Sequence, residues 1–368
     1  MRIDKLKLER FRNYEALEVS FDEKCNVIYG ENAQGKTNLL EAVLYLGSAK
    51  SPRSRSDKEL ISFSAAEGRV EGSIFSRERD FKVEIDLFRG KSRKITVNGV
   101  RQKTAGGLSG ILNTVYFCPD DLYLIRSGAS ERRRFMDISL CQLRPRYEKA
   151  LTEYNRLYEH KTRILRDSDE KPDLLKSLPD FNLRMAEMGA VIIHYRARFV
   201  KALADYAAQA HFECSGGREE LTLSYETVSS VTDPFASYEE LLRELLDHQE
   251  RHYAAELASR LCLSGPHKDD LNVLIGGKSA KQFASQGQAR TAALSLKLSE
   301  REIHKNTTGE YPVLLLDDVL SELDPKRQEY VLNRIAGGQV FITCCEDDRL
   351  GEMMGGKVLK IENGRVAE

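Results

Sequence analysis

The sequence predicts an α/β protein in which both ends of the chain contribute strands to a mixed sheet, with a smaller, mostly helical lobe inserted between them. Strand-like alternation fills the first 30 residues, and short apolar runs of strand length recur from residue 271 onward. Residues 69–100 hold three β-rich segments separated by charged turns, which predict an antiparallel portion. Residues 130–214 are charged and have helical spacing, so they supply most of the predicted lobe.

The composition excludes several classes of protein. Of 368 residues, 41% are hydrophobic and 31% are charged, as in a folded domain that dissolves in water. No run approaches the ~18 apolar residues of a membrane-spanning helix, and the first ten residues lack the apolar core of a signal peptide. The seven cysteines form no CxxC pair, which argues against a zinc site and against a disulfide framework. We therefore expect a cytoplasmic protein with no membrane partner.

The order of the predicted elements is strand, helix, antiparallel strands, helical lobe and strands again. A helix follows a glycine-rich turn at residues 37–47, and a strand at residues 114–118 ends before a proline. Residues 171–180 separate two helical arms of about three heptads each, which predict a short antiparallel pair and no long coiled coil. The last strand region contains an Asn-Gly pair typical of a tight hairpin. The later segments are a β segment at 220–228, a helix at 238–261 and strands at 271–275, 313–318, 339–345 and 357–366.

We predict two domains, a head of residues 1–128 and 262–368 and a lobe of residues 129–261. Charge is unevenly distributed along the chain. The net charge is −1, but residues 50–166 contain 25 Lys or Arg against 15 Asp or Glu. A basic surface attracts the phosphate backbone of nucleic acids, whereas solvated helix faces and loop tips give the same pattern without any ligand. Composition alone leaves both interpretations open.

A glycine-rich motif, GENAQGKT, matches the pattern G-x-x-x-x-G-K-[ST] at every fixed position. A predicted strand precedes it and a predicted helix follows it, which is the context that a phosphate-binding loop requires. Backbone N–H groups would hold the β-phosphate, Lys36 would bridge the β- and γ-phosphates, and the Thr37 hydroxyl would be a Mg²⁺ ligand. The predicted ATP-binding residues are Gly30, Glu31, Asn32, Ala33, Gln34, Gly35, Lys36, Thr37 and Asn38, with Lys36 also catalytic.

A second acidic strand is predicted at VLLLDD, residues 313–318. Its apolar residues indicate burial on both faces, and two carboxylates stand at its C-terminal end. Asp317 is expected to hold Mg²⁺ through a water molecule, and Asp318 is expected to orient or deprotonate the attacking water. A buried strand that ends in two acids is common. The assignment of a function to this strand therefore depends on the phosphate loop upstream and on SELD directly after it.

A third element is FASQGQ, residues 283–288, which precedes a predicted helix at residues 289–303. Ser285 and the backbone around Gly287 could cap a γ-phosphate at the start of that helix. A Ser/Gly turn before a helix is commonplace by itself. This prediction therefore depends on the other motifs.

In this order, GENAQGKT, ASQGQ, VLLLDD and SELD resemble the phosphate loop, signature, second acidic strand and D-loop of the ABC-type ATPase heads. In such heads the signature of one subunit caps the nucleotide of the other, so the resemblance implies a homodimer that forms on ATP. Lys36 and Asp317 stand at opposite ends of the chain, and this split resembles the SMC family. The resemblance assigns Ser285, Gln286, Gly287 and Gln288 to the signature in trans and Ser321, Glu322, Leu323 and Asp324 to the D-loop.

The insert without a long heptad array narrows the resemblance to the RecF family of bacterial recombinational repair. The similar segments cover nearly the whole chain in order, at residues 11–21, 30–46, 127–151, 265–271 and 285–291. The resemblance implies ATP and Mg²⁺ as cofactors and a weak, DNA-stimulated ATPase that uses ATP as a dimerisation switch. It also implies binding to double-stranded DNA and to single-strand/double-strand junctions. RecR would be a partner, with RecO and RecA involved indirectly.

Three positions depart from the wider ABC pattern. Transporter heads carry a histidine after the strand that follows the D-loop, and here that place holds Thr343, Cys344 and Cys345. The catalytic position holds Asp318 rather than glutamate, and this shorter carboxylate without a neighbouring histidine suits slow turnover. The glutamine of the Q-loop is missing, and FCPDD occupies its place, with Asp120 or Asp121 as candidates.

Several residues keep two interpretations. Arg12 could reach the nucleotide or lie on the surface, and His267 could gate the signature or bond to a backbone carbonyl. Five arginines could contact DNA phosphates or simply cover the surface: Arg53, Arg55, Arg132, Arg133 and Arg134.

Three functional classes remain open. They are a DNA-repair clamp driven by ATP binding, the ATPase subunit of a membrane transporter, and a P-loop kinase that acts on a small molecule. The split motifs and the missing histidine disfavour the transporter. The signature segment disfavours a kinase, which would not need it as a monomer.

Overall fold

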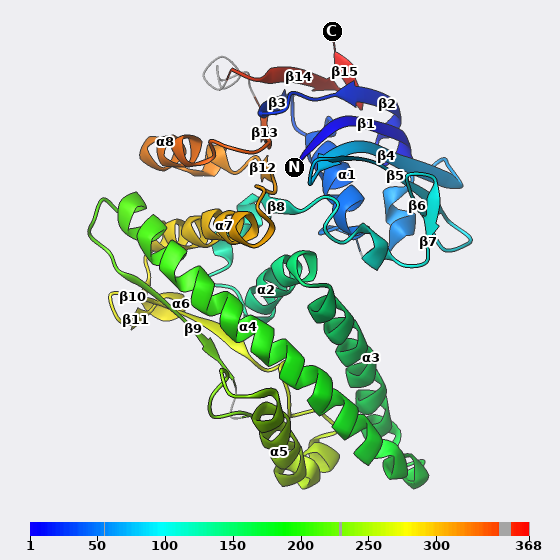
Figure 1. Ribbon diagram of the computed structural model, residues 1–368, viewed down its shortest axis with the longest axis vertical. Coiled ribbons are helices and arrows are strands. Elements are labelled where there is room, and N and C mark those ends of the chain that lie inside the picture. Colours follow the sequence, from blue (N-terminus) through cyan, green and yellow to red (C-terminus); the bar gives the residue numbers. More distant parts are fainter. Residues whose placement is uncertain (55, 228–229, 346–354, 368) are drawn as a thin grey trace. The chain divides into compact units, whose positions relative to one another are not determined.

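The computed structural model describes residues 1–54, 56–227, 230–345 and 355–367. The chain forms two compact units, a head unit of Met1–Leu122 with Lys297–Glu368 and a lobe unit of Tyr123–Leu296. Figure 1 labels their helices and strands. The lobe unit takes in residues 262–296, which the sequence had placed with the head, because the strand that begins at Asp270 pairs inside the lobe.

One sheet of the head unit is antiparallel, with strand order β2-β1-β4-β5-β6-β7. Buried and half-buried residues alternate along β4 and the second half of β5, because successive side chains of a strand point to opposite faces. This sheet is the antiparallel portion that the sequence predicted. Its strands are β1 (Arg2–Phe11), β2 (Tyr14–Ser20), β4 (Glu67–Ser76), β5 (Arg79–Phe88), β6 (Lys94–Val97) and β7 (Val100–Gln102).

The second sheet of the head unit is mixed, with strand order β15-β14-β3-β13-β12-β8. All neighbours in it run parallel except β14 and β15, which form the predicted Asn-Gly hairpin. Strands β12 and β13 are buried along their whole length, which explains their continuous apolar sequences. The strands are β3 (Cys25–Tyr29), β8 (Thr114–Phe117), β12 (Val313–Asp317), β13 (Val340–Cys344), β14 (Lys357–Glu362) and β15 (Arg365–Ala367).

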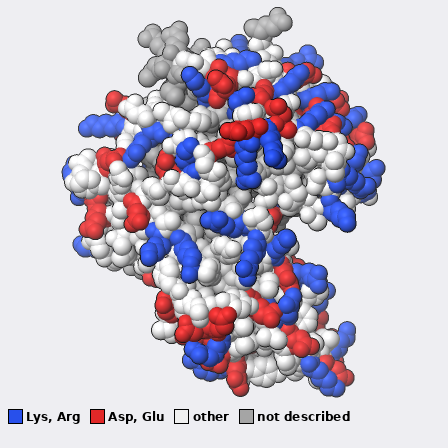
Figure 2. Space-filling model, in the orientation of Figure 1, with Lys and Arg blue, Asp and Glu red and all other residues white. Residues whose placement is uncertain are grey.

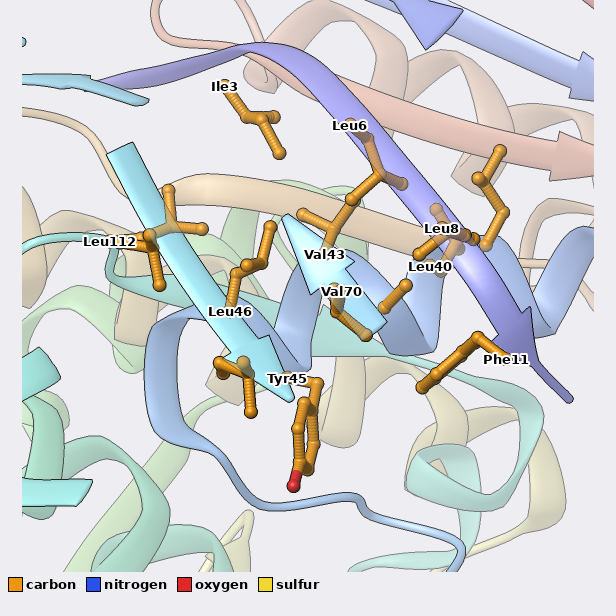
Figure 3. Packing of buried hydrophobic residues seen from close by; sticks show 14 of the residues in the cluster. Ile3, Leu6, Leu8, Phe11, Leu40, Val43, Tyr45, Leu46, Val70 and Leu112 are labelled. Carbon is orange, nitrogen blue, oxygen red and sulfur yellow. The ribbon is translucent and has the colours of Figure 1, made fainter. Parts of the chain in front are cut away.

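Helix α1 (Lys36–Ser48) contacts strands of both sheets, and their buried side chains form one hydrophobic core. Figure 3 shows Leu40 and Val43 of α1 beside Leu6 and Leu8 of β1. Burying apolar surface stabilises this arrangement by roughly 25 cal/mol per Å². The start of α1, where the phosphate loop ends, is therefore fixed to both sheets. Helix α8 (Pro325–Arg334) also belongs to the head unit, and helix α7 (Gln286–Thr308) runs from the lobe unit into the head unit.

The lobe unit combines helices with a three-stranded sheet of order β11-β10-β9. Helix α3 has 23 residues, close to the predicted arm of about three heptads, whereas α4 has 37. Helix α4 packs on β9 and α5 as well as on α3. The elements are α2 (Ala129–Leu143), α3 (Pro145–Asp167), α4 (Leu178–Cys214), β9 (Leu221–Glu226), α5 (Tyr238–Ser259), β10 (Asp270–Ile275), β11 (Lys278–Ser279) and α6 (Ala280–Phe283).

A polar cluster lies inside the lobe unit, formed by Arg196, Asp137 and Tyr147; we call it the lobe cluster. One Arg196 nitrogen donates to both oxygens of the Asp137 carboxylate, at 2.8 and 3.0 Å, and another donates to the Pro266 carbonyl at 2.8 Å. The Tyr147 hydroxyl donates to the same carboxylate. These bonds satisfy a guanidinium that is only 3% exposed.

Three general findings hold for the part of the chain that the structure describes. No helix there is long and apolar enough to cross a bilayer. No group of three or more His, Cys, Asp or Glu side chains there could hold a metal ion. All seven cysteines lie in that part and carry free thiols.

Candidate nucleotide-binding site

The loop of residues 30–35 joins β3 to α1 and follows the predicted strand–loop–helix order. Gly30 has a φ of 149° and Gly35 a φ of 118°, a region that other residues rarely adopt. A Cβ atom at Gly30 would lie 2.3 Å from the carbonyl oxygen of Ile361, and one at Gly35 would lie 2.6 Å from the amide of Asn13. Gly30 is therefore required both by its backbone angle and by the backbone of Ile361, and Gly35 is required by its backbone angle.

Lys36 is the first residue of α1, and its side chain is buried. Its ammonium group donates to the carbonyl oxygens of Gly30 at 2.5 Å and Glu31 at 2.9 Å, so it bends back over the loop. No described side chain caps this helix N-terminus at Gly35. Because the first N–H groups of a helix lack partners within the helix, this end can bind an anion.

The loop is held from two sides through Gln34. Its carbonyl oxygen accepts hydrogen bonds from the Asn13 side chain at 2.8 Å and from the Gly364 N–H at 3.1 Å. Its side-chain oxygen accepts from the Asn363 N–H at 2.6 Å. Asn13 also accepts a bond from Asn38 in α1 at 2.8 Å. The apex of the loop, Glu31 to Ala33, stays exposed.

Asp317 ends β12, is 5% exposed, and accepts hydrogen bonds from three hydroxyl groups. Thr37 and Thr343 each donate to Oδ1 at 2.9 Å, and Tyr116 donates to Oδ2 at 2.6 Å. The contact with Thr37 brings together the two residues predicted to hold Mg²⁺, which are 280 positions apart in the sequence.

Sequence reasoning missed Tyr116 and noted Thr343 only as the residue that replaces a histidine. The register of the sheet explains both contacts, because Leu315 and Asp317 share one face of β12. Tyr116 pairs with Leu315 and Thr343 pairs with Asp317, so all four side chains project from that face. Burial, reinforced by the charge of Asp317, raises the pKa of Tyr116, so its hydroxyl remains a donor.

Asp318 has a left-handed backbone with a φ of 53°, which is uncommon for a residue other than glycine. Its N–H donates to the Thr343 hydroxyl at 2.8 Å. The Ser321 hydroxyl donates to the carbonyl of Asp318 at 2.7 Å and to its carboxylate at 3.2 Å. The side chain is half-buried beside Asp317, and its catalytic role stays a prediction.

The four residues of SELD have different surroundings. Leu323 is buried, whereas Ser321 and Glu322 are exposed. Asp324 is the N-cap of α8, since its side chain accepts from the Arg327 N–H at 3.2 Å and forms an ion pair with the Arg327 guanidinium. Asp324 is also exposed, so Ser321, Glu322 and Asp324 are the solvent-exposed part of the predicted D-loop.

Arg12 has a partner within the head unit. Its guanidinium donates to both oxygens of Glu41 at 2.8 Å each, and Glu41 is 1% exposed. A further bond reaches the carbonyl of Glu59 at 2.9 Å. A bidentate pair of this kind anchors the β1–β2 turn to α1. Contact between Arg12 and a nucleotide stays a prediction.

The predicted signature lies in the lobe unit, at the start of α7. The Ser285 N–H donates to the Gln288 side chain at 2.8 Å, and the Gln288 N–H donates to the Ser285 hydroxyl at 3.2 Å. This reciprocal pair is a capping box of the kind that begins a helix. Ser285 and Gln286 are exposed, whereas Gly287 and Gln288 are half-buried.

The structure corrects the prediction of a DNA contact for Arg132. Its guanidinium is 3% exposed and binds both carboxylate oxygens of Asp270 at 2.7 Å each. It also donates to the carbonyls of Ile125 and Ser127, at 3.2 and 2.6 Å. A buried and paired guanidinium of this kind joins α2 to β10 and is closed to a phosphate group.

The other arginines of that prediction differ in exposure. Arg133 is half-buried and donates to the carbonyl of Asp269 at 2.7 Å, and burial lowers its pKa. Arg53 and Arg134 are exposed. Arg55 lies outside the described residues.

Of the two candidate aspartates at the Q-loop position, Asp121 has partners within the head unit and Asp120 faces solvent. Asp121 accepts from the Cys118 N–H at 2.9 Å and lies 3.7 Å from the ammonium group of Lys297. Asp120 is exposed. Burial, with the charge of Asp121, raises the pKa of Cys118 to about 12.

Of the two interpretations of His267, the structure shows the bond to a backbone carbonyl. Its Nε2 faces the Cys262 carbonyl at 3.0 Å, and its Nδ1 faces the Tyr154 hydroxyl at 2.7 Å. Burial lowers the pKa of His267 to about 4. The bond to a backbone carbonyl is thus confirmed.

The atoms around Thr37 and Asp317 fit a hard divalent cation. A hydroxyl and a carboxylate oxygen, the kinds that Mg²⁺ prefers, lie 2.9 Å apart. Among the described residues Asp317 takes part in no ion pair, and its hydrogen bonds come from hydroxyl groups. With Lys36 and the loop N–H groups, this set could hold a magnesium nucleotide.

The phosphate loop, the adjacent acidic strand and the mixed sheet define an ATP-binding ATPase head of the ABC type. The family model described as RecF/RecN/SMC N terminal domain matches residues 2–365. The chain belongs to the RecF family of DNA replication and repair proteins. Of the three functional classes that the sequence left open, this family is the repair class.

Individual relatives span the whole chain. The DNA replication and repair protein RecF of Agathobacter rectalis is 40% identical over 100% of this chain and 99% of its own length. The RecF protein of Acetivibrio thermocellus is 39% identical, with both chains covered completely. A structure of the recombination mediator protein RecF-ATP in the RecFOR pathway is 34% identical, has a TM-score of 0.90 and covers 99% of this chain and 96% of its own. An Smc head domain from Pyrococcus furiosus is 16% identical with a TM-score of 0.56, covers 99% of this chain and 94% of its own, and shows the fold alone.

Proposed function

We propose that this protein is an ATP-dependent DNA-binding protein of recombinational repair, in which two copies join around ATP and the joined pair grips duplex DNA. The observation that carries the proposal is the contact between Thr37 and Asp317, which assembles one site from the two ends of the chain. The relative described as RecF-ATP supports ATP as the nucleotide.

Different residues of the head unit would bind ATP and catalyse its hydrolysis. N–H groups of the loop and of the first turn of α1 bind the β-phosphate, and Lys36 exchanges its carbonyl partners for the β- and γ-phosphates. Thr37 and Asp317 hold Mg²⁺, which when bound neutralises phosphate charge. Asp318 orients the attacking water and accepts its proton. Since Asp318 is short and Thr343 cannot carry a charge, we expect a weak ATPase.

The second copy would complete the site. Ser285, Gln286, Gly287 and Gln288 of that copy close over the γ-phosphate, which the exposed position of Ser285 and Gln286 supports. The exposed Ser321 bonds to Asp318, and Ser321 and Glu322 would face the same partner. Hydrolysis removes the shared phosphate and lets the two copies separate.

The DNA-binding part of the proposal rests on exposed basic side chains, which grip phosphates without reading bases. Figure 2 shows Lys and Arg side chains gathered at the edge that carries β6 and β7. The exposed residues there are Lys91, Lys94, Arg101 and Lys103. We further propose that DNA stimulates hydrolysis, that junctions at gaps are targets, and that RecR and RecO act with this protein in the cytoplasm to load RecA.

Light scattering with ATP, with ADP and without nucleotide tests the nucleotide-driven pairing. We expect the wild-type protein to dimerise with ATP alone. Lys36→Ala should weaken ATP binding about 100-fold, because it removes a charged donor to phosphate, and should stay monomeric. Ser285→Arg should bind ATP normally and stay monomeric.

The matched control is Ser130→Arg, which puts the same charge at another exposed serine of the lobe unit and should dimerise like the wild type. Dimerisation of Ser285→Arg on ATP would show that the signature does not act in trans. Anisotropy of labelled gapped duplex at several salt concentrations then tests DNA binding. Phosphate contacts give an affinity that falls steeply with salt, and a flat salt dependence would contradict a backbone grip.

A further inference from the structure

We propose that Tyr116 and Thr343 are positioning residues for the magnesium-binding carboxylate, and that their hydroxyl groups fix its plane so that Oδ1 of Asp317 faces Thr37. This inference rests on the proposed function, because it requires a magnesium nucleotide on residues 30–37. It adds two residues of the neighbouring strands that none of the sequence motifs contains.

A carboxylate in this place needs external support to keep one orientation. The terminal torsion of an aspartate side chain is broad and roughly two-fold, so the group rotates easily when only one oxygen is bound. Here both oxygens have partners, with Tyr116 on Oδ2 at 2.6 Å and Thr343 on Oδ1 at 2.9 Å. The two donors come from β8 and β13, the strands on either side of β12. The plane of the carboxylate is therefore set by the sheet itself.

The bonds from the strands differ in kind from the bond to Thr37. The Thr37 hydroxyl donates to Oδ1 at 2.9 Å and is itself a predicted magnesium ligand. As a ligand it would bind the ion through an oxygen lone pair, and its hydrogen could remain on Asp317. Tyr116 and Thr343 have no predicted metal contact, so orienting the carboxylate is the only role their bonds would have. They would hold the carboxylate in one place both before and after metal binding.

Thr343 has a second task that Tyr116 lacks. Its hydroxyl donates to Asp317 and accepts the N–H of Asp318 at 2.8 Å, so one side chain ties both acids together. That bond also supports the left-handed backbone of Asp318. The orientation of the metal ligand and that of the predicted catalytic residue are coupled through this hydroxyl.

The experiment uses Tyr116→Phe in the full-length protein and a fluorescent ATP analogue at fixed concentration. Binding is followed while MgCl₂ is titrated, and it is measured again in EDTA. We expect the Mg²⁺ concentration for half-maximal binding to rise about tenfold, as for other residues that orient metal ligands. Affinity in EDTA should stay at the wild-type value, because Tyr116 contacts the carboxylate and not the phosphate loop.

The matched control is Tyr45→Phe. Tyr45 is a buried tyrosine of the same unit whose hydroxyl donates to an aspartate, Asp57, at 2.8 Å. It lies nine residues after Lys36, about 13 Å along α1. Its loss should leave the Mg²⁺ titration unchanged. Thr343 offers a second pair of variants, since Thr343→Ser keeps the hydroxyl and should behave like the wild type, whereas Thr343→Val should shift the titration as Tyr116→Phe does.

Two outcomes would overturn the inference while leaving the proposed function standing. One is a wild-type Mg²⁺ dependence in both Tyr116→Phe and Thr343→Val. The other is an equal loss of affinity with Mg²⁺ and in EDTA, which would indicate general damage to the site. If the wild-type protein itself bound no magnesium nucleotide, the proposed function would fail, and the inference would fail with it.

Discussion

Two largely buried carboxylates, Asp317 in the head unit and Asp137 in the lobe unit, are held in opposite ways. Asp137 faces the guanidinium of Arg196, which cancels its charge. Asp317 faces three hydroxyl groups and, among the described residues, no cation. A hydroxyl dipole orients a negative charge without cancelling it. Both acids are shielded from solvent and hydrogen-bonded. They differ in the charge of their partners, and this difference distinguishes Asp317, a predicted metal ligand, from Asp137, a structural residue.

In the lobe cluster, the guanidinium of Arg196 and the carboxylate of Asp137 form an ion pair. Burial alone would lower the pKa of Arg196, but Tyr147 and Asp137 outweigh it and raise that pKa. The guanidinium therefore keeps its charge, and it already bonds to Asp137 and to the Pro266 carbonyl. Asp317 has no cationic partner among the described residues, and the two aspartate variants below test this difference.

The largest effect on stability is expected from Asp137→Asn. The substitution removes the carboxylate that forms the ion pair with the buried Arg196, which should lower the free energy of unfolding by about 3 kcal/mol. Urea denaturation measures that change, and nucleotide affinity of the folded protein should not change. Glu131→Gln removes an exposed carboxylate of the same helix and should cost less than about 0.5 kcal/mol. Equal stability of the two variants would mean that the lobe cluster contributes little.

A smaller effect is expected from acid, through His267 of the lobe. The unfolded chain binds a proton at this side chain near pH 6.5, whereas the folded chain does so only near pH 4. Stability is therefore lost as the pH falls through this window. Between pH 7 and pH 5 we expect the wild type to lose about 1–2 kcal/mol more than His267→Gln. His160→Gln, at an exposed histidine of α3, should follow the wild-type profile. Identical profiles for the wild type and His267→Gln would rule out this contribution.

The smallest effect on stability is expected from Asp317→Asn. The amide oxygen can still accept from Thr37 and Thr343, and the amide N–H can donate to the Tyr116 hydroxyl oxygen once that hydroxyl rotates. No buried cation loses its partner, so the free energy of unfolding should change by less than about 1 kcal/mol. The Mg²⁺-dependent part of nucleotide affinity should nevertheless fall at least about tenfold. Urea denaturation and the MgCl₂ titration measure the two quantities. If this variant were as unstable as Asp137→Asn, the contrast between the two acids would be invalid.

The sequence predicted the parts of the site that are local in the chain. GENAQGKT and VLLLDD each carry their pattern within eight residues, and the phosphate loop, α1 and β12 lie where the patterns placed them. Tyr116 could not be found in this way, because its contact with Asp317 depends on the register between β8 and β12. The register between two parallel strands that are distant in the sequence cannot be read from the sequence of either strand alone.

The case of Arg132 is different, since a signal was present. Arg132, Phe135, Met136 and Ser139 are buried and lie three, four and seven residues apart, which is one face of a helix. Arg134 lies off that face and is exposed. Helical phase could therefore have separated the arginines that composition alone treated as one basic cluster.

The hairpin of β14 and β15 has a consequence for how the protein is made. Asn363 bonds to Gln34 across 329 positions of sequence, and Ile361 lies against Gly30. Because a ribosome synthesises the amino end first, the nucleotide loop emerges long before the strands that clasp it. The contacts that hold this loop would thus form only after residues 361–363 have left the ribosome, when the preceding lobe has had time to fold.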